Sequence, residues 1–117
     1  MKKVNRIVSN REFNSIINRK KKTYNSSFTV YYTFKKEGKL KVGISVSKKN
    51  FKTAVLRNKI KRQVRAMCDE IMAIDLNVDI VIIVSKNYLN FDYKLNKENL
   101  NLIYKKIISE VKTHETI

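Results

Sequence analysis

The side chains best suited to chemistry in this chain are cations gathered in one short segment. Between Lys48 and Arg65, eight of eighteen residues are lysine or arginine and none is acidic. Ammonium and guanidinium groups bind phosphate oxygens, and the guanidinium fork can also hold a guanine edge. The segment therefore predicts a surface that binds a polyanion. The residues expected to carry this binding are Lys48, Lys49, Lys52, Arg57, Asn58, Lys59, Lys61, Arg62 and Arg65.

The charge of the whole chain supports the same prediction. Its 117 residues include 26 basic and 10 acidic side chains, a formal net charge of +16. Residues 38–68 hold ten basic side chains and no acidic one, whereas residues 69–117 carry a small negative balance. Charge that serves only solubility is mixed in sign, and positive charge this dense destabilises a compact fold unless a polyanion neutralises it. Nucleic acid and an anionic membrane surface are the candidate partners.

Nucleic acid is the partner that the apolar residues favour. A helix that lies on a membrane needs bulky aromatic side chains on its apolar face, and residues 54–74 contain none. The longest apolar run, Ile80–Val84, is far too short to span a bilayer. The N-terminal residues lack the apolar stretch of a secretory signal, and a single cysteine, Cys68, fits a reducing compartment. We therefore expect a cytoplasmic protein that does not engage a membrane.

The sequence does not predict a self-sufficient enzyme. The one histidine, His114, falls where we expect a frayed C-terminal tail. Cys68 lies beside the apolar stripe of a predicted helix, where a buried thiol is expected rather than a nucleophile. Asp69 and Glu70 are adjacent, so on a helix they point apart and are expected to be solvated. No metal-ligand spacing, phosphate-binding loop or small-molecule site is evident.

A helix over residues 54–74 would position the cations. Its apolar residues, from Leu56 to Ile74, recur at helical spacing and form one stripe. Arg57, Lys61 and Arg65 follow the edge of that stripe, about 6 Å apart along the axis, which is close to the phosphate spacing of one strand. A solvated face is the ordinary explanation of a charge run, but such faces intersperse glutamate with lysine. The uninterrupted cations favour nucleic acid.

The remaining patterns predict one domain over residues 1–117, a two-layer α+β sandwich. The order is helix, strand, strand, helix, strand, helix, with a small sheet and a long basic central helix. Ser9 and Glu12 have the capping-box spacing and open the first helix. The later elements are strands at Phe28–Phe34, Leu40–Val46 and Val78–Val84 and a helix at Lys97–Lys112.

One face of the predicted sheet is available for a ligand. Strand alternation places Tyr31 and Ser45 opposite the apolar face, so we expect that face to be open. Phe13 and Ile17 of the first helix could join them in a groove that holds a single nucleic-acid strand by stacking. The alternative is that Phe13 and Ile17 belong to the core. For Ile17, the pattern favours the groove and the core equally.

The central segment resembles the bacterial ribonuclease P protein component. The matching residues run from Val42 to Lys49 (VGISVSKK) and from Ala54 to Arg65 (AVLRNKIKRQVR). Chain length, basicity and the order of the elements also agree. The resemblance extends from about Arg6 to the last helix, but only residues 42–65 carry specific motifs.

This resemblance implies a protein that binds a catalytic RNA and helps it remove the 5′ leader of precursor tRNA. The RNA would hold the Mg²⁺ ions that perform the hydrolysis, and the protein alone would bind no cofactor. Residues matched to the family's RNA contacts are Arg57, Asn58, Lys61, Arg62 and Arg65. Those matched to its leader cleft are Phe13, Ile17, Tyr31 and Ser45. The family also has a left-handed strand–helix–strand crossover, against the usual rule.

The chain departs from the family's pattern at a few positions. Lys59 replaces an arginine and loses its fork geometry. Ile17 stands where an aromatic is common, and the loop Asn50–Thr53 lacks a frequent glycine. A ribosomal or other structural RNA-binding protein is the main alternative function, and a DNA-binding protein that places residues 54–65 in the major groove is a third.

Overall fold

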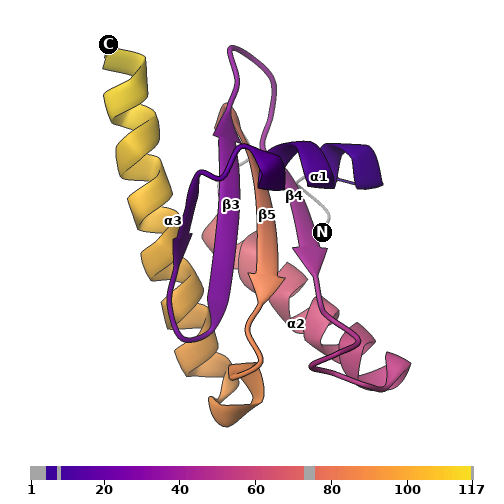
Figure 1. Ribbon diagram of the computed structural model, residues 1–117. Coiled ribbons are helices and arrows are strands. Elements are labelled where there is room, and N and C mark those ends of the chain that lie inside the picture. The colour runs from indigo at the N-terminus through magenta and orange to yellow at the C-terminus, as the bar shows by residue number, and fades with distance from the viewer. Residues whose placement is uncertain (1–4, 8, 73–75, 117) are drawn as a thin grey trace.

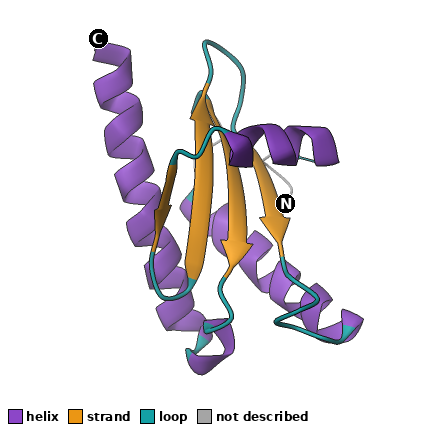
Figure 2. Cartoon of the chain, viewed as in Figure 1, coloured by secondary structure: helices purple, strands orange, loops and turns teal. Residues whose placement is uncertain are grey.

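The computed structural model describes residues 5–7, 9–72 and 76–116. Three α-helices, a short 3₁₀-helix and five strands occur in these ranges (Figures 1 and 2). The α+β class predicted from the sequence is confirmed. In chain order the elements are β1 (Asn5–Arg6), α1 (Asn10–Asn18), β2 (Lys22–Tyr24), β3 (Phe28–Phe34), β4 (Lys41–Ser45), α2 (Ala54–Ile71), β5 (Val78–Val84), η1 (Tyr88–Asn90) and α3 (Tyr93–Thr116).

The described strands form one mixed sheet in the order β1-β4-β5-β3-β2. β5 lies at its centre, antiparallel to β3 and parallel to β4. The sequence of β5, VDIVIIV, is nearly all apolar because side chains on both of its faces are covered. Val81 is buried on one face, and Ile80 and Ile82 are buried on the other.

The connection from β4 through α2 to β5 is left-handed. In Figure 1 the arrows of β4 and β5 point the same way, β5 lies to the left of β4, and α2 crosses behind both strands. A right-handed connection would place α2 in front of them. Most parallel crossovers are right-handed, so this feature distinguishes the fold from ordinary α/β units.

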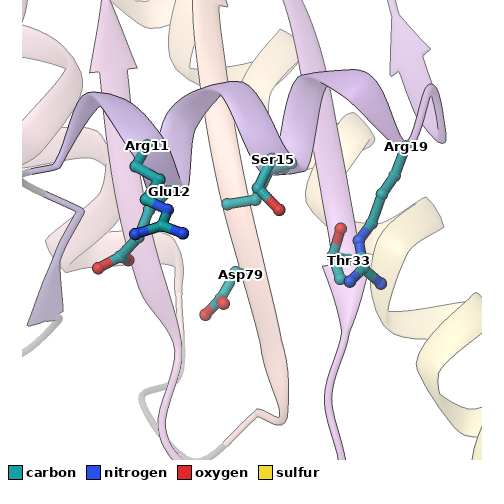
Figure 3. Close-up of a pocket in the computed structure, with 7 residues that line it drawn as sticks. Arg11, Glu12, Ser15, Arg19, Thr33 and Asp79 are labelled. Carbon is teal, nitrogen blue, oxygen red and sulfur yellow. The ribbon is translucent and has the colours of Figure 1, made fainter.

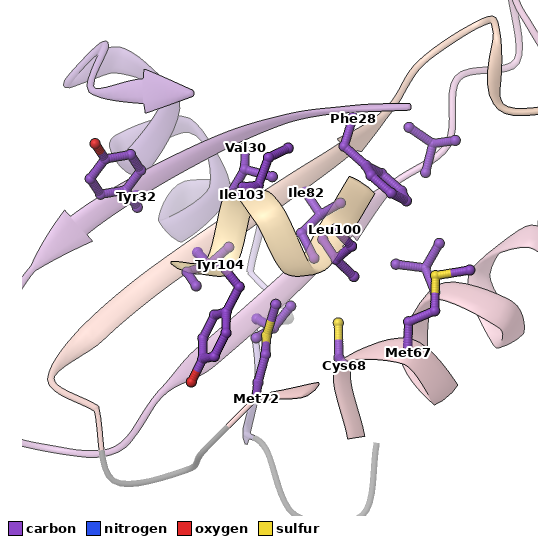
Figure 4. Packing of buried hydrophobic residues seen from close by; sticks show 14 of the residues in the cluster. Phe28, Val30, Tyr32, Met67, Cys68, Met72, Ile82, Leu100, Ile103 and Tyr104 are labelled. Atoms are coloured by element: carbon purple, nitrogen blue, oxygen red, sulfur yellow. The ribbon is translucent and has the colours of Figure 1, made fainter. Parts of the chain in front are cut away.

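The main core lies between the sheet and the helices α2 and α3 (Figure 4). α2 contributes a stripe that includes Val64 and Met67, and α3 contributes Leu100 and Ile107. The two residues named on α2 are three apart and the two on α3 are seven apart, so each helix turns one continuous apolar face to the strands. On β3 the predicted alternation is confirmed: Phe28, Val30 and Tyr32 are buried in this core.

A smaller cluster lies on the opposite face of the sheet, under α1. Ile16 of α1 packs with Ile7 and Val81, and Tyr31 and Phe13 pack around them. The expectation of an open sheet face was therefore wrong in part. One amphipathic helix of nine residues covers the middle of that face and leaves grooves at its sides.

Several predicted boundaries differ from the structure. The strands β1 and β2 were missed because two or three residues are too few to show an alternation pattern. α2 ends at Ile71, and Ile74, which was assigned to its stripe, lies outside the described residues. α3 begins four residues earlier than expected, because the Asp92 carboxylate accepts the Leu95 amide and caps it. It also continues through His114, where a frayed tail was expected.

None of the described helices combines the length and the apolar character that a membrane span requires.

Candidate nucleic-acid interface

The outer side of α2 presents the predicted cations. Thr53 caps the helix, its hydroxyl accepting the Leu56 amide at 3.2 Å. The apolar stripe then fixes the rotation of the helix, so that Arg57, Lys61 and Arg65 lie half-buried along its edge. Further out, the exposed side chains are Asn58, Lys59 and Arg62.

The cations of residues 48–65 are not neutralised within the described part of the chain. Its ion pairs join Lys21 to Glu110, Lys35 to Asp79, Lys41 to Glu12 and Lys97 to Glu70, and none involves that segment. Burial lowers the pKa of the Arg65 guanidinium, and the positive charge of Arg6 adds to the effect. Like charges held this way create a positive potential that an external anion would relieve.

Arg57 has a structural role that its position in the sequence did not reveal. Its guanidinium turns toward the loop before the helix and donates to the carbonyl oxygens of Phe51 and Lys52, at 2.8 and 3.0 Å. The buried Phe51 ring anchors the same loop, and its amide donates to the Ser47 carbonyl oxygen at 2.9 Å. These bonds define the path of the loop, and they hold Lys48 and Lys49 at the exposed turn.

The groove beside α1 depends on a close approach between a helix and a strand. Ser9 caps α1, its hydroxyl accepting the amides of Arg11 and Glu12. The Phe13 ring then lies directly on Gly43 of β4, where a Cβ atom would come within 2.5 Å of Phe13 Cζ. Because glycine has no Cβ, the ring can pack against the backbone of the strand.

The groove has a volume of about 350 Å³ and lies between α1, β4 and α2. Three of the four residues assigned to a strand-binding cleft, Phe13, Ile17 and Ser45, line it. Tyr31 packs in the same apolar cluster but is not among the lining residues. The other lining residues are Asn10, Asn14, Ile44, Val46 and Lys61.

Lys61 connects the two predicted sites. It belongs to the cationic edge of α2, and it also lines the groove beside α1. A strand lying in the groove would therefore have apolar and aromatic surface on one side and a cation on the other. This combination is typical of single-strand binding, in which bases stack and phosphates pair with cations.

Sequence reasoning missed three residues of this surface. Arg6 lines a small hollow of about 90 Å³ together with Arg65 and Gly43. Asn10 and Asn14 supply amide groups to the groove beside α1. The helical spacing of Asn10, Phe13, Asn14 and Ile17 could have grouped the two asparagines with the predicted pair. For Arg6, no sequence feature except its charge indicated that it belongs to this surface.

The other side chains that could react chemically are buried or paired within the fold. Cys68 is fully buried, and burial raises the pKa of its thiol to about 12, as expected for an inert thiol. Glu70 pairs with Lys97 and joins α2 to α3. Asp69 was expected to be solvated, but its Oδ1 is buried and no described residue forms a hydrogen bond with it. Among the described residues, no cluster of histidine, cysteine, aspartate or glutamate could hold a metal ion.

Comparison with known proteins gives a consistent result. A family model named Ribonuclease P matches residues 1–108. The "Ribonuclease P protein component" of Mycoplasma capricolum is 40% identical over 114 residues, which cover 96% of this chain and all of that protein. The protein of the same name from Mycoplasma mobile is 36% identical over 107 residues, covering 92% and 93% of the two chains.

Solved structures agree in fold. The RNase P protein of Staphylococcus aureus superimposes with a TM-score of 0.78 at 34% identity, over 93% of this chain and 98% of that one. The RNase P protein of Thermotoga maritima gives a TM-score of 0.71 at 29% identity, over 86% and 96% of the two chains.

Proposed function

This chain belongs to the ribonuclease P protein family, and we propose that it presents α2 to the ribonuclease P RNA and the groove beside α1 to the 5′ leader of precursor tRNA. It is the protein subunit of a tRNA-processing ribonuclease. Family membership decides among the three functions that the basic segment left open, in favour of tRNA maturation over ribosomal or DNA binding. Cytoplasmic localisation is part of the same proposal, because the protein must be in the compartment where precursor tRNA is processed.

The observation that carries the proposal is the continuity of two surfaces. A cationic helix face, which no carboxylate of the described residues neutralises, meets at Lys61 a groove lined by Phe13 and Ile17. The helix face suits a folded RNA, which offers closely spaced phosphates. The groove suits a single strand, whose bases can stack on an aromatic ring. One protein can therefore hold the RNA subunit and the leader together.

The chemistry of cleavage is assigned to the RNA. Mg²⁺ prefers carboxylate and other hard oxygen ligands, whereas residues 38–68 contain ten cations and no acid. The interface therefore does not fit a protein-held Mg²⁺ ion, and no cofactor is assigned to this chain alone. Its contribution is to bind, to orient the leader and to offset the repulsion between two RNA molecules.

Cleavage of a precursor tRNA by a bacterial ribonuclease P RNA at low Mg²⁺ concentration tests this function. We expect the wild-type protein to restore accurate leader removal. The variant Lys59→Gln/Arg62→Gln removes two exposed cations from α2 without disturbing the bonds that Arg57 makes. It should bind the RNA more weakly and lower the slope of log affinity against log salt concentration by about 2.

The matched control is Lys105→Gln/Lys106→Gln, which removes two exposed cations from α3. Both variants have the same net charge, so a general electrostatic effect would weaken them equally. Equal loss in the two variants would contradict the assignment of α2 as the RNA-binding face. Failure of the wild-type protein to stimulate cleavage by any ribonuclease P RNA would contradict the function itself.

A further inference from the structure

α1 separates the sheet face into two grooves, and the second one has a different chemistry. The first groove, lined by Phe13, Ile17 and Lys61, is called the leader groove below. Arg11, Ser15 and Arg19 lie at i, i+4 and i+8 on the side of α1 that faces away from it. Below them, the sheet contributes Thr33 from the end of β3 and Asp79 from the start of β5 (Figure 3). Together with Glu12 and Ile16, these residues line a groove of about 310 Å³.

The second groove continues around the end of α1. A neighbouring hollow of about 430 Å³ shares Arg19 and Thr33 with it and adds Lys21, Tyr32 and Phe34. The Lys21 ammonium lies 4.4 Å from the centre of the Phe34 ring. Cationic side chains from Arg11 to Lys21 therefore line the two neighbouring hollows.

The polar groups of the second groove lie at different depths, from the exposed rim to the buried floor. The arginines at the rim are exposed, and the apolar side chain of Ile16 is buried beneath them. Asp79 is 24% exposed, with Lys35 Nζ at 2.7 Å from its Oδ1. The Thr33 hydroxyl oxygen is buried and has no hydrogen-bond partner among the described residues. A buried polar group without a partner costs free energy, so a ligand that hydrogen-bonds to Thr33 would recover it.

This arrangement favours a ligand with both donor and anionic groups over a simple ion. An inorganic anion would lie near the carboxylates of Asp79 and Glu12, which also pair with Lys35 and Lys41. A simple cation would lie near Arg11 and Arg19. The ligand that satisfies both sets carries N–H donors at one end and negative charge at the other. A nucleotide has this chemistry, because a base with an amino group can donate to a carboxylate while its phosphate pairs with arginine.

We propose that the groove formed by Arg11, Arg19, Thr33 and Asp79 binds a guanine nucleotide, with the base edge on Asp79 and the phosphate on the two arginines. Guanine offers two adjacent N–H donors to the two oxygens of a carboxylate, whereas uracil offers one donor between two acceptors. The site is separate from the leader groove and does not depend on its assignment. The same chemistry could come from a guanosine within a single-stranded RNA or from free GMP.

Amide resonances of the ¹⁵N-labelled full chain can test the proposal. Titration with GMP should shift the amides of Thr33 and Asp79, whereas UMP and inorganic phosphate should shift them far less. The heptamers UUUGUUU and UUUUUUU distinguish the two sources. A preference of roughly fivefold or more for UUUGUUU, the lower range of one bidentate contact, assigns the site to an RNA strand. Shifts with GMP but no heptamer preference assign it to the free nucleotide.

Two variants separate recognition from structure. Asp79→Asn replaces one acceptor oxygen with a donor and should abolish the preference for guanine. Lys35→Gln breaks the same ion pair but keeps the carboxylate, so the preference should remain. If both variants lose it, or if GMP and UMP shift Thr33 equally, the site does not read guanine and the proposal is wrong. The Ser45 amide reports on the leader groove in the same spectra, so binding there is distinguished from binding at the second groove.

Discussion

The two faces of the sheet differ in how completely they are covered. On the face packed by α2 and α3, the core includes Phe28, Leu100 and Ile80, all fully buried. On the other face, α1 buries only Ile16 from its own nine residues, and hollows remain along both sides of the helix. The two faces therefore have different roles. The well-packed face supplies the stability, so the other face can remain incompletely packed and available to ligands.

Substitutions that remove equal side-chain volumes from the two faces should show this difference most clearly. Leu100→Ala should lower the free energy of unfolding by about 3–5 kcal/mol, because a fully enclosed site cannot collapse around the cavity. Ile16→Ala should cost about 2 kcal/mol, because the grooves beside α1 let the helix and solvent adjust. Urea unfolding followed by circular dichroism measures both values. Equal losses would show that the α1 face is as tightly packed as the other.

The contact between α1 and β4 can be tested next. Gly43→Ala places a Cβ atom against the Phe13 ring and should destabilise the protein by about 1–3 kcal/mol. In Gly43→Ala/Phe13→Leu the smaller side chain relieves the clash, so the two changes should be less than additive. Thermal unfolding of the single and double variants provides the measurement. Strict additivity would mean that the ring does not rest on Gly43 in solution.

A smaller effect is expected from the leader groove itself. Phe13→Ala should weaken binding of a precursor tRNA with a leader by about 1–2 kcal/mol, because a stacking surface is lost. Binding of a mature tRNA without a leader should be unchanged. Asn18→Ala, at the exposed end of α1, is the control. Fluorescence titration of the protein–RNA complex gives the affinities, and equal weakening for both tRNAs would remove Phe13 from the leader path.

The well-packed face should also have a pH dependence that can be measured. Burial raises the pKa of the Cys68 thiol from 9.0 to about 12. The folded state therefore retains a proton that the unfolded state loses, and stability that is present below pH 9 falls as pH rises toward 12. Between pH 9 and pH 10 the free energy of unfolding should fall by about 1 kcal/mol more in the wild type than in Cys68→Ala. Parallel curves for the two proteins would show that the thiol is solvated.

Local patterns explain which parts of this fold were predictable. The apolar stripe of α2 and the alternation of β3 depend only on residues close together in the sequence. The positions and buried faces of these two elements therefore followed from residue spacing alone. Short β1 and β2 lack such a pattern, and they exist only because β4 and β3 offer free edges for pairing. The cap of α3 at Asp92 was also present in the sequence and was overlooked.

The site was predictable to the extent that one element carried it. The sequence by itself determined the cationic face of α2 and its charge imbalance, because helical geometry orders side chains within a single segment. Only the tertiary structure decided that Arg57 turns inward to the loop carbonyls, that Phe13 lies on Gly43, and that Lys61 joins the helix to the groove. It also placed Arg19 and Asp79, sixty residues apart in the chain, in the lining of one groove. Contacts of this kind depend on how elements pack across the sheet, and short-range periodicity carries no information about that arrangement.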